Sequence, residues 1–164
     1  MYKNQNTLSK AIEFDGIGLH SGERVKIILI PAAVDTGIKF KINNSLISAI
    51  WKNAIVSQLC TRIKLKDNAI STIEHLMAAI SGLGITNLLI KINSNEVPIL
   101  DGSSKEFVEK IKNIGIKEQK KKQKILKILK KVEYKEKEKF IRISPSEKKN
   151  LTIHYTIDYK DQFI

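Results

Sequence analysis

Residues 71–84, STIEHLMAAISGLG, combine a helical pattern of apolar side chains with a Glu–His pair near the start of the segment. At about 100° per residue, one side of the predicted helix carries a continuous apolar stripe. This stripe consists of Ile73, Leu76, Met77, Ile80 and Leu83. The other side carries His75, Ala78 and Ala79, where a surface helix normally carries charged residues. We therefore expect protein to cover both sides of this helix, with His75 lying between two layers.

The Glu–His pair has two interpretations. Ser71 and Glu74 have the spacing of a capping box, in which a hydroxyl and a carboxylate each accept a hydrogen bond from a backbone amide at the helix start. Glu74 would then have a structural role. Alternatively, an imidazole such as that of His75 can bind a metal ion while the neighbouring carboxylate acts as a general base. The residue types alone leave both interpretations open.

Strands are predicted on both sides of this helix. Residues 8–14 and 24–30 alternate as strands, and the glycine-rich stretch DGIGLHSGE at 15–23 joins them. A phosphate-binding glycine loop needs a helix directly after the glycines. A strand follows here, so we interpret the loop as a chain reversal and not as a nucleotide site. Further extended segments are predicted at 37–42, 53–57, 58–65 and 86–93.

The remaining sequence divides into a helix, a charged run and a second set of strands. Residues 104–115 are predicted as a helix that Gly115 ends, with Ser103 and Glu106 as a second capping box. Residues 117–124 lack an apolar period and are expected to form a basic linker. Strands are then predicted at 125–134, 139–145 and 151–159.

These elements place the chain in the α+β class. Residues 1–116 are expected to form a first domain with a layer of sheet and two helices, and the linker spans 117–124. Residues 125–164 are expected to be the incomplete start of a second, similar domain. About forty residues of strand are too few to form an independent core, and no predicted helix covers them.

The formal net charge of +12 favours an anionic partner, such as nucleic acid, a membrane surface or a phosphorylated substrate. Almost all of the positive charge comes from Lys, because the only arginines are Arg24, Arg62 and Arg142. Recognition of bases and bidentate binding of phosphate favour Arg. We therefore expect a solvated lysine surface and no nucleic-acid partner. A nucleic-acid-binding module centred on residues 117–131 is the alternative, although this segment has no aromatic residue to stack on bases.

Cys60 is the only cysteine, which excludes an internal disulfide and a zinc site with several cysteines. A reducing compartment is expected. No stretch approaches the roughly 18 apolar residues of a membrane span, and no charged start precedes an apolar run. The sequence therefore predicts a cytoplasmic protein without a transmembrane segment.

Four blocks together resemble a known enzyme family. They are FDGIGLHSG at 14–22, LCT at 59–61, ISTIEHLMAAISGLGITN at 70–87 and VPILDGSSKEFV at 97–108. In this order and at these separations they closely resemble the first half of the zinc-dependent UDP-3-O-acyl-N-acetylglucosamine deacetylases of lipid A synthesis. The resemblance implies two similar domains, each a layer of sheet with two helices, that pack helix to helix as a β-α-α-β sandwich.

The resemblance also implies roles for individual residues. Glu74 is similar to the family's general base, and His75 to one of three ligands of the zinc ion (Zn2+). His20 resembles a loop residue that borders the substrate site. Leu59, Cys60 and Thr61 resemble the segment that lines the cleft near the metal. Without the resemblance, His20 would be interpreted as an exposed loop residue and Cys60 as a small buried one.

The family's remaining zinc ligands lie in an H-K-x-x-D pattern of the second domain, which this sequence does not contain. The expected function is removal of the N-acetyl group from UDP-3-O-acyl-N-acetylglucosamine, the committed step of lipid A synthesis, and this chain alone is expected to be inactive. The sequence would then be a fragment or a degraded copy, or another polypeptide would supply the second domain. An inactive remnant of the family is the other alternative.

Overall fold

A computed structural model describes residues 3–147 and 151–158 of the chain. The chain divides into two compact units, with the first ending at Gln123 and the second starting at Lys124. Each unit is described by itself. Among the described residues, no helix is long and apolar enough to cross a membrane. The cytoplasmic location stays a prediction.

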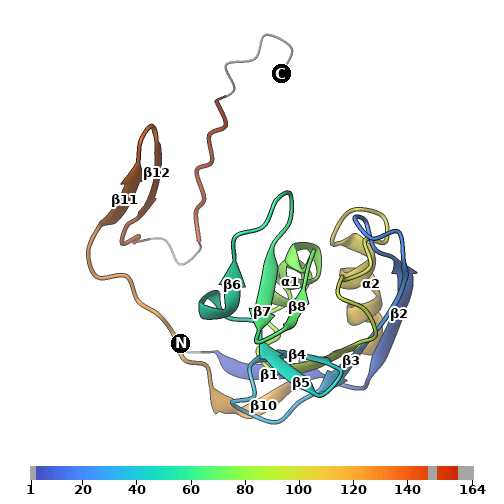
Figure 1. The fold of residues 1–164 in the computed structure, drawn as a ribbon. Helices are drawn as coiled ribbons and strands as arrows, with labels where there is room; N and C mark the ends of the chain where they lie inside the picture. The colour runs from blue at the N-terminus through green and yellow to red at the C-terminus, as the bar shows by residue number, and fades with distance from the viewer. Residues whose placement is uncertain (1–2, 148–150, 159–164) are drawn as a thin grey trace. The chain divides into compact units, whose positions relative to one another are not determined.

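The first unit is built on a five-stranded sheet with the order β2-β3-β9-β4-β5 (Figure 1). Its strands are β2 (Ile12–Ile17), β3 (Arg24–Pro31), β4 (Ile38–Ile42), β5 (Ser45–Ser48) and β9 (Leu88–Ile92). Neighbouring strands are antiparallel except for β4 and β9, which run parallel. In β3, Val25, Ile27 and Leu29 are buried, whereas the alternate residues face away from the core, as the period of a strand requires.

Two smaller sheets complete the first unit. One pairs β1 (Asn4–Leu8) with β10 (Ile116–Lys122), and the other has the order β6-β7-β8. The strands of the second sheet are β6 (Ala54–Ile55), β7 (Arg62–Leu65) and β8 (Asn68–Ile70), preceded by the short 3-10 helix η1 (Trp51–Asn53). The extended segments predicted at 53–57 and 58–65 are therefore strands over only part of their length.

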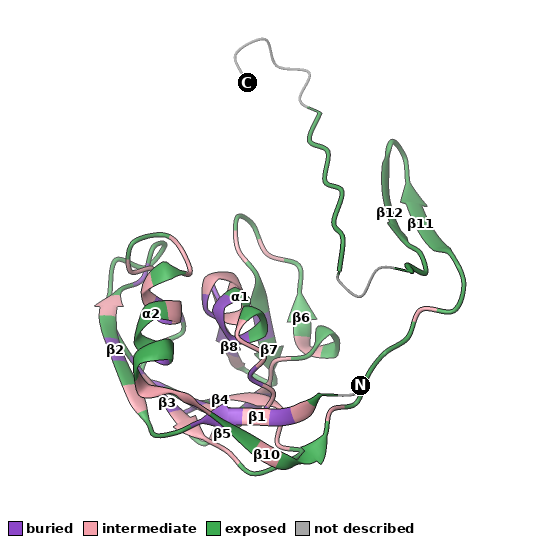
Figure 2. Cartoon of the chain, turned by 180° about the vertical axis from the view of Figure 1, so that it is seen from behind, coloured by how far each residue is buried: buried purple, intermediate pink, exposed green. Residues whose placement is uncertain are grey.

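Helices α1 (Glu74–Gly82) and α2 (Lys105–Ile114) lie side by side on one face of the five-stranded sheet (Figures 1 and 2). The core lies between this face and the helices. Phe107 of α2 contacts Phe14 of β2 with ring centroids 4.9 Å apart, and Leu76 of α1 is fully buried. The predicted α+β class and both predicted helices are confirmed.

The other side of α1 differs from the prediction. Ala78, Ser81 and Gly82 are exposed, and His75 is half-buried. Ala79, which was also predicted on this side, is buried at 1% exposure. Within the described residues, protein therefore covers the second side of the helix only in part. The small residues on the other side leave a smooth helix surface without charged side chains.

The charged run after α2 is a strand for most of its length. Residues 116–122 form β10, which pairs antiparallel with β1, so the prediction of a linker over 117–124 is wrong for these residues. The strand has no apolar period, because its contacts with the rest of the unit are made largely by polar side chains. Gln119 donates to the carbonyl of Ala32, and Lys121 forms an ion pair with Asp35.

The second unit contains the hairpin of β11 (Val132–Glu136) and β12 (Lys139–Ile143). All residues of both strands are exposed. Residues 125–131, the first part of the predicted strand 125–134, are not in a strand. Residues 151–158 are not in a strand either, although their apolar residues alternate; residue 159 lies outside the described residues. These segments lack a partner strand within the described part of the chain, and alternation alone does not make a strand.

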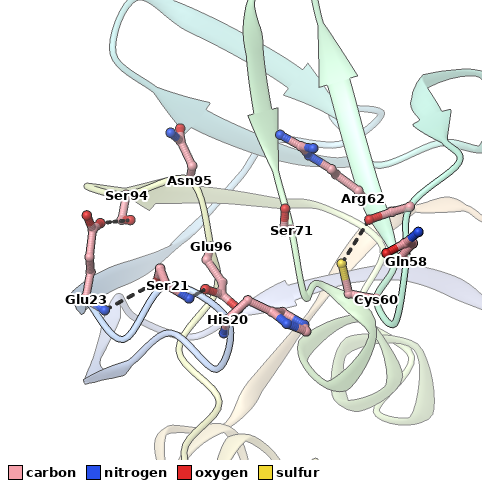
Figure 3. Close-up of a pocket in the computed structure, with 11 residues that line it drawn as sticks. His20, Ser21, Glu23, Gln58, Cys60, Arg62, Ser71, Ser94, Asn95 and Glu96 are labelled. Carbon is pink, nitrogen blue, oxygen red and sulfur yellow. Dashed lines mark hydrogen bonds between the residues drawn. The ribbon is translucent and has the colours of Figure 1, made fainter.

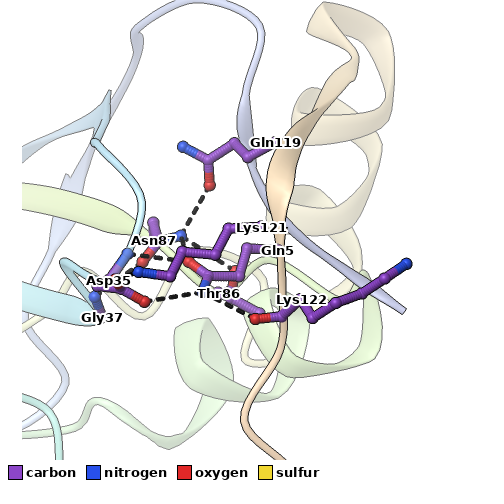
Figure 4. Close-up of polar contacts among 8 residues, drawn as sticks. All are labelled: Gln5, Asp35, Gly37, Thr86, Asn87, Gln119, Lys121 and Lys122. Carbon is purple, nitrogen blue, oxygen red and sulfur yellow. Dashed lines mark hydrogen bonds and ion pairs between the residues drawn. The ribbon is translucent and has the colours of Figure 1, made fainter. Parts of the chain in front are cut away.

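A buried amide connects β1 and β10 to the main sheet (Figure 4). Asn87 is 1% exposed and donates to the side-chain oxygens of Gln5 at 2.8 Å and Gln119 at 2.7 Å. Its own side-chain oxygen accepts from the amide of Gly37 at 2.9 Å. One side chain, directly before β9, therefore contacts both ends of the first unit.

Replacement of this amide tests its structural role. We expect Asn87→Ala to lower the free energy of unfolding by about 2–3 kcal/mol, because buried donors and acceptors lose their partners. Asn113→Ala, on the exposed side of α2, is the matched control and should change it by no more than about 0.5 kcal/mol. Urea unfolding of the three proteins measures this, and equal effects of the two variants would contradict the assignment.

Candidate active site

Glu74 and His75 occupy the first turn of α1, and both are half-buried. The carboxylate of Glu74 accepts a hydrogen bond from the backbone amide of Thr61 at 2.9 Å. The predicted capping box is wrong, because the helix has no side-chain cap and Ser71 instead pairs through its backbone with residues 95 and 97. Glu74 is thus held by another segment of the chain and not by its own helix start.

The capping box predicted for Ser103 and Glu106 at the start of α2 is also wrong, because this helix has no side-chain cap. The residue that precedes α2 is Ser104, and its hydroxyl donates to the carbonyl of His75 at 2.8 Å. The hydroxyl of Ser103 accepts from the amide of Lys105 at 3.0 Å and donates to Asp101. The start of α2 therefore holds the backbone of α1 at the residue next to Glu74.

The segment with Leu59, Cys60 and Thr61 forms the loop between β6 and β7. Leu59 has a φ of 60° and a side chain that is 91% exposed. Cys60 is half-buried, with its sulfur 3.2 Å from the hydroxyl of Ser57. Thr61 is exposed. Its amide donates to the carboxylate of Glu74, and its carbonyl accepts from the amide of Ile73. This loop therefore fixes the helix start through backbone atoms.

A polar pocket of about 410 Å³ brings the loop of β6–β7 together with the glycine-rich loop of β2–β3 (Figure 3). The residues that line it are His20, Ser21, Glu23, Ser57, Gln58, Cys60, Arg62, Ser71, Ser94, Asn95 and Glu96. Of the six predicted site residues, His20 and Cys60 line this pocket. Leu59, Thr61, Glu74 and His75 do not, but the Thr61 amide links Glu74 to the loop that carries Cys60.

Glu96 is a site residue that the sequence reasoning missed. It is 4% exposed, and its carboxylate accepts from the amides of His20 at 3.0 Å and Ser21 at 2.9 Å and from the hydroxyl of Thr72 at 2.8 Å. Burial raises the pKa of this carboxyl, but the hydrogen bonds from His20, Ser21 and Thr72 outweigh burial and lower the pKa from 4.5 to about 2. Glu96 is therefore a buried carboxylate that stays charged.

Gly18 permits this arrangement. A Cβ atom at this position would lie 2.5 Å from the Glu96 carboxylate and 2.3 Å from the hydroxyl of Ser21. Both distances are far below van der Waals contact, so a larger residue would displace the carboxylate or the loop. The glycine-rich reversal predicted from the sequence is thus confirmed as a loop that packs around a carboxylate.

A zinc ion needs about three protein ligands in a fixed geometry. Among the residues that the structure describes, no group of three His, Cys, Asp or Glu side chains could hold a metal ion. His75 offers one imidazole, and the described part of the chain does not by itself fit a zinc site.

A carboxylate and an imidazole at one helix start, which the Thr61 amide links to a loop of the polar pocket, have the chemistry that suits part of a metal-dependent hydrolase. The sequence profile of the UDP-3-O-acyl N-acetylglycosamine deacetylases matches residues 5–164. The chain therefore belongs to the family of UDP-3-O-acyl N-acetylglycosamine deacetylases.

Several curated relatives carry the name UDP-3-O-acyl-N-acetylglucosamine deacetylase. The relative from Campylobacter lari is 42% identical over 98% of this chain, and the one from Oleidesulfovibrio alaskensis is 40% identical over 95%. The relative from Neisseria gonorrhoeae is 39% identical over 94% of the chain. The chain covers 55%, 52% and 53% of these relatives, respectively, and so spans about half of their length.

The lowered pKa of Glu96 predicts a pH-dependent stability. Because the folded pKa is about 2 and the ordinary value is 4.5, the carboxylate stabilises the fold above pH 4.5, and this contribution is lost as the pH falls toward 2. The difference in unfolding free energy between the parent and Glu96→Gln should shrink by on the order of 3 kcal/mol over this range.

Urea unfolding at a series of pH values measures this difference. Glu109→Gln, at an exposed position of α2, serves as the control and should follow the parent at every pH. A constant difference between the parent and Glu96→Gln from pH 7 to pH 2 would contradict the assignment.

Proposed function

We propose that this chain contributes the general base and one metal ligand to an enzyme that hydrolyses the N-acetyl group of UDP-3-O-acyl-N-acetylglucosamine in lipid A synthesis. Membership of the deacetylase family supports this proposal, together with the names of its relatives. The structural observation that carries it is the position of Glu74. Its half-buried carboxylate lies next to His75 and is fixed by the amide of Thr61.

Glu74 has the geometry to accept a proton. One carboxylate oxygen accepts from the Thr61 amide at 2.9 Å, so the side chain has a fixed orientation. A carboxylate held in this way can take the proton of a water molecule that attacks the acetamide carbonyl. The proton can then pass to the nitrogen of the leaving amine, which releases acetate and the free amino sugar.

His75 is proposed as one of three zinc ligands. The further ligands lie outside the described residues, in the same polypeptide or in another one. The exposed, uncharged side of α1 supports this proposal, because a second layer of helices could pack closely on Ala78 and Gly82. A β-α-α-β sandwich would place such a layer directly over His75.

The substrate-binding role is proposed for His20, Leu59, Cys60 and Thr61. His20 and Cys60 line the polar pocket, and Leu59 and Thr61 flank Cys60. The exposed side chain of Leu59 offers an apolar contact to a bound molecule. Thr61 carries both a hydroxyl and the backbone amide that holds Glu74.

A hybrid enzyme tests the proposal. Residues 1–164 of this chain replace the matching part of the Campylobacter lari relative, and acetate release from the UDP-linked substrate is measured together with bound zinc. We expect an active parent hybrid. Glu74→Gln should keep the bound zinc and lower turnover by about 100- to 10,000-fold, because an amide cannot accept the proton.

Two further variants distinguish the roles. His75→Ala should lower zinc content and turnover together, because it removes a ligand. Glu109→Gln, on the exposed side of α2, should leave both unchanged. Near-parental turnover of Glu74→Gln in an active hybrid would end the catalytic assignment.

The isolated chain provides a separate check. Because no group of three His, Cys, Asp or Glu side chains among the described residues could hold a metal ion, we expect weak zinc binding and no acetate release. Zinc that stays bound at one equivalent after dialysis, together with acetate release by the chain alone, would contradict this expectation.

A further inference from the structure

The residue two positions before Glu74 has an unusual backbone conformation. Thr72 is 2% exposed and has a φ of 58°, in the left-handed region. This region is strongly unfavourable for a β-branched residue and persists only where the surroundings enforce it. Helix α1 therefore begins two positions after a strained residue, and the direction of its first turn depends on what holds that residue.

The segment of residues 95–97 holds Thr72 and its neighbour. The Thr72 hydroxyl donates to the Glu96 carboxylate at 2.8 Å. On the preceding residue, the amide of Ser71 donates to the carbonyl of Asn95 at 2.9 Å, and the amide of Val97 donates to the carbonyl of Ser71 at 3.1 Å. Only one of these contacts uses a side chain of the segment, and that side chain is Glu96.

The same carboxylate also holds the loop that carries His20. Its oxygens accept from the amides of His20 and Ser21, which lie 75 or more positions away in the sequence. One side chain thus connects a wall of the polar pocket with Thr72, two positions before Glu74.

We infer that Glu96 is a positioning residue, which sets the first turn of α1 and the His20 loop relative to each other. The inference rests on the proposed function, because it assigns to Glu96 the placement of Glu74 and His75. Glu96 acts through Thr72 and through backbone amides, and the chemical step is left to Glu74. No resident cofactor is needed for this role.

Amide hydrogen exchange of the full chain tests the inference and does not require enzyme activity. Glu96→Gln replaces one acceptor oxygen with a donor. Relative to the amides of β3, the amides of His20, Ser21, Ile73 and Met77 should then exchange roughly tenfold faster. This is the effect expected from the loss of one buried hydrogen bond. Thr72→Val keeps the shape and removes the hydroxyl, so it should speed exchange only at Ile73 and Met77. Thr72→Ser keeps the hydroxyl and should restore parental exchange.

Asn87→Ala is the control, because it weakens the unit away from this site and should not change the exchange of these four amides relative to β3. Parental exchange of Ile73 and Met77 in both Glu96→Gln and Thr72→Val would overturn the inference. Thr72→Val makes the test independent of whether Glu96→Gln folds.

The hybrid enzyme gives the functional readout. Glu96→Gln and Thr72→Val should lower kcat by roughly 10- to 100-fold, the effect of a misplaced catalytic group, with KM changed by less than about threefold. Thr72→Ser should recover most of the parental kcat. Unchanged kcat in an active hybrid would overturn the inference. If the parent hybrid is inactive, the proposed function fails, and the exchange experiment alone decides whether Glu96 positions the helix start.

Discussion

The buried amide of Asn87 joins more segments of the first unit than a strand pairing can, because it contacts both terminal strands and the Gly37 turn. A side-chain amide with two donors and one acceptor is placed where the start of β9, the Gly37 turn and the two terminal strands meet. Apolar contacts such as those of Leu8 help to set the register of these strands, and the polar contacts of Asn87 add to them. Because the hydrogen bonds of Asn87 are directional, they favour the one alignment of β1 and β10 in which all of its partners are reached.

The sequence predicted the elements whose signal is local. Helices α1 and α2 and strands β3 and β9 carry a clear apolar period, and the structure places them close to the predicted bounds. Strand β10 was missed because its pairing depends on polar contacts, with Gln119 bonded to Asn87 and Ala32. The opposite case is the strand predicted over 151–159. Residues 151–158 have the alternation of a strand but do not form one, because no partner strand lies beside them in the described part of the chain.

The site was predicted in part for the same reason. The Glu–His pair and the loop residues were proposed as site residues from blocks of sequence that resemble one family, and their roles stay a prediction. Glu96 follows a strand and precedes an apolar run, and nothing local distinguishes it from an exposed carboxylate. Its partners His20 and Ser21 lie far away in the sequence. A capping box was predicted at Ser71 from spacing alone, but the backbone of that residue pairs with residues 95 and 97.

The lysines of β10 have a consequence for association between molecules. Within the described residues, β10 pairs only with β1, so its other edge offers backbone groups to which another strand could add. Lys117, Lys120 and Lys122 are exposed along this edge strand. Like charges on two such edges would repel each other, and lysine on edge strands is a common protection against aggregation. The basic run at 117–122 would thus disfavour edge-to-edge pairing of two copies of the protein.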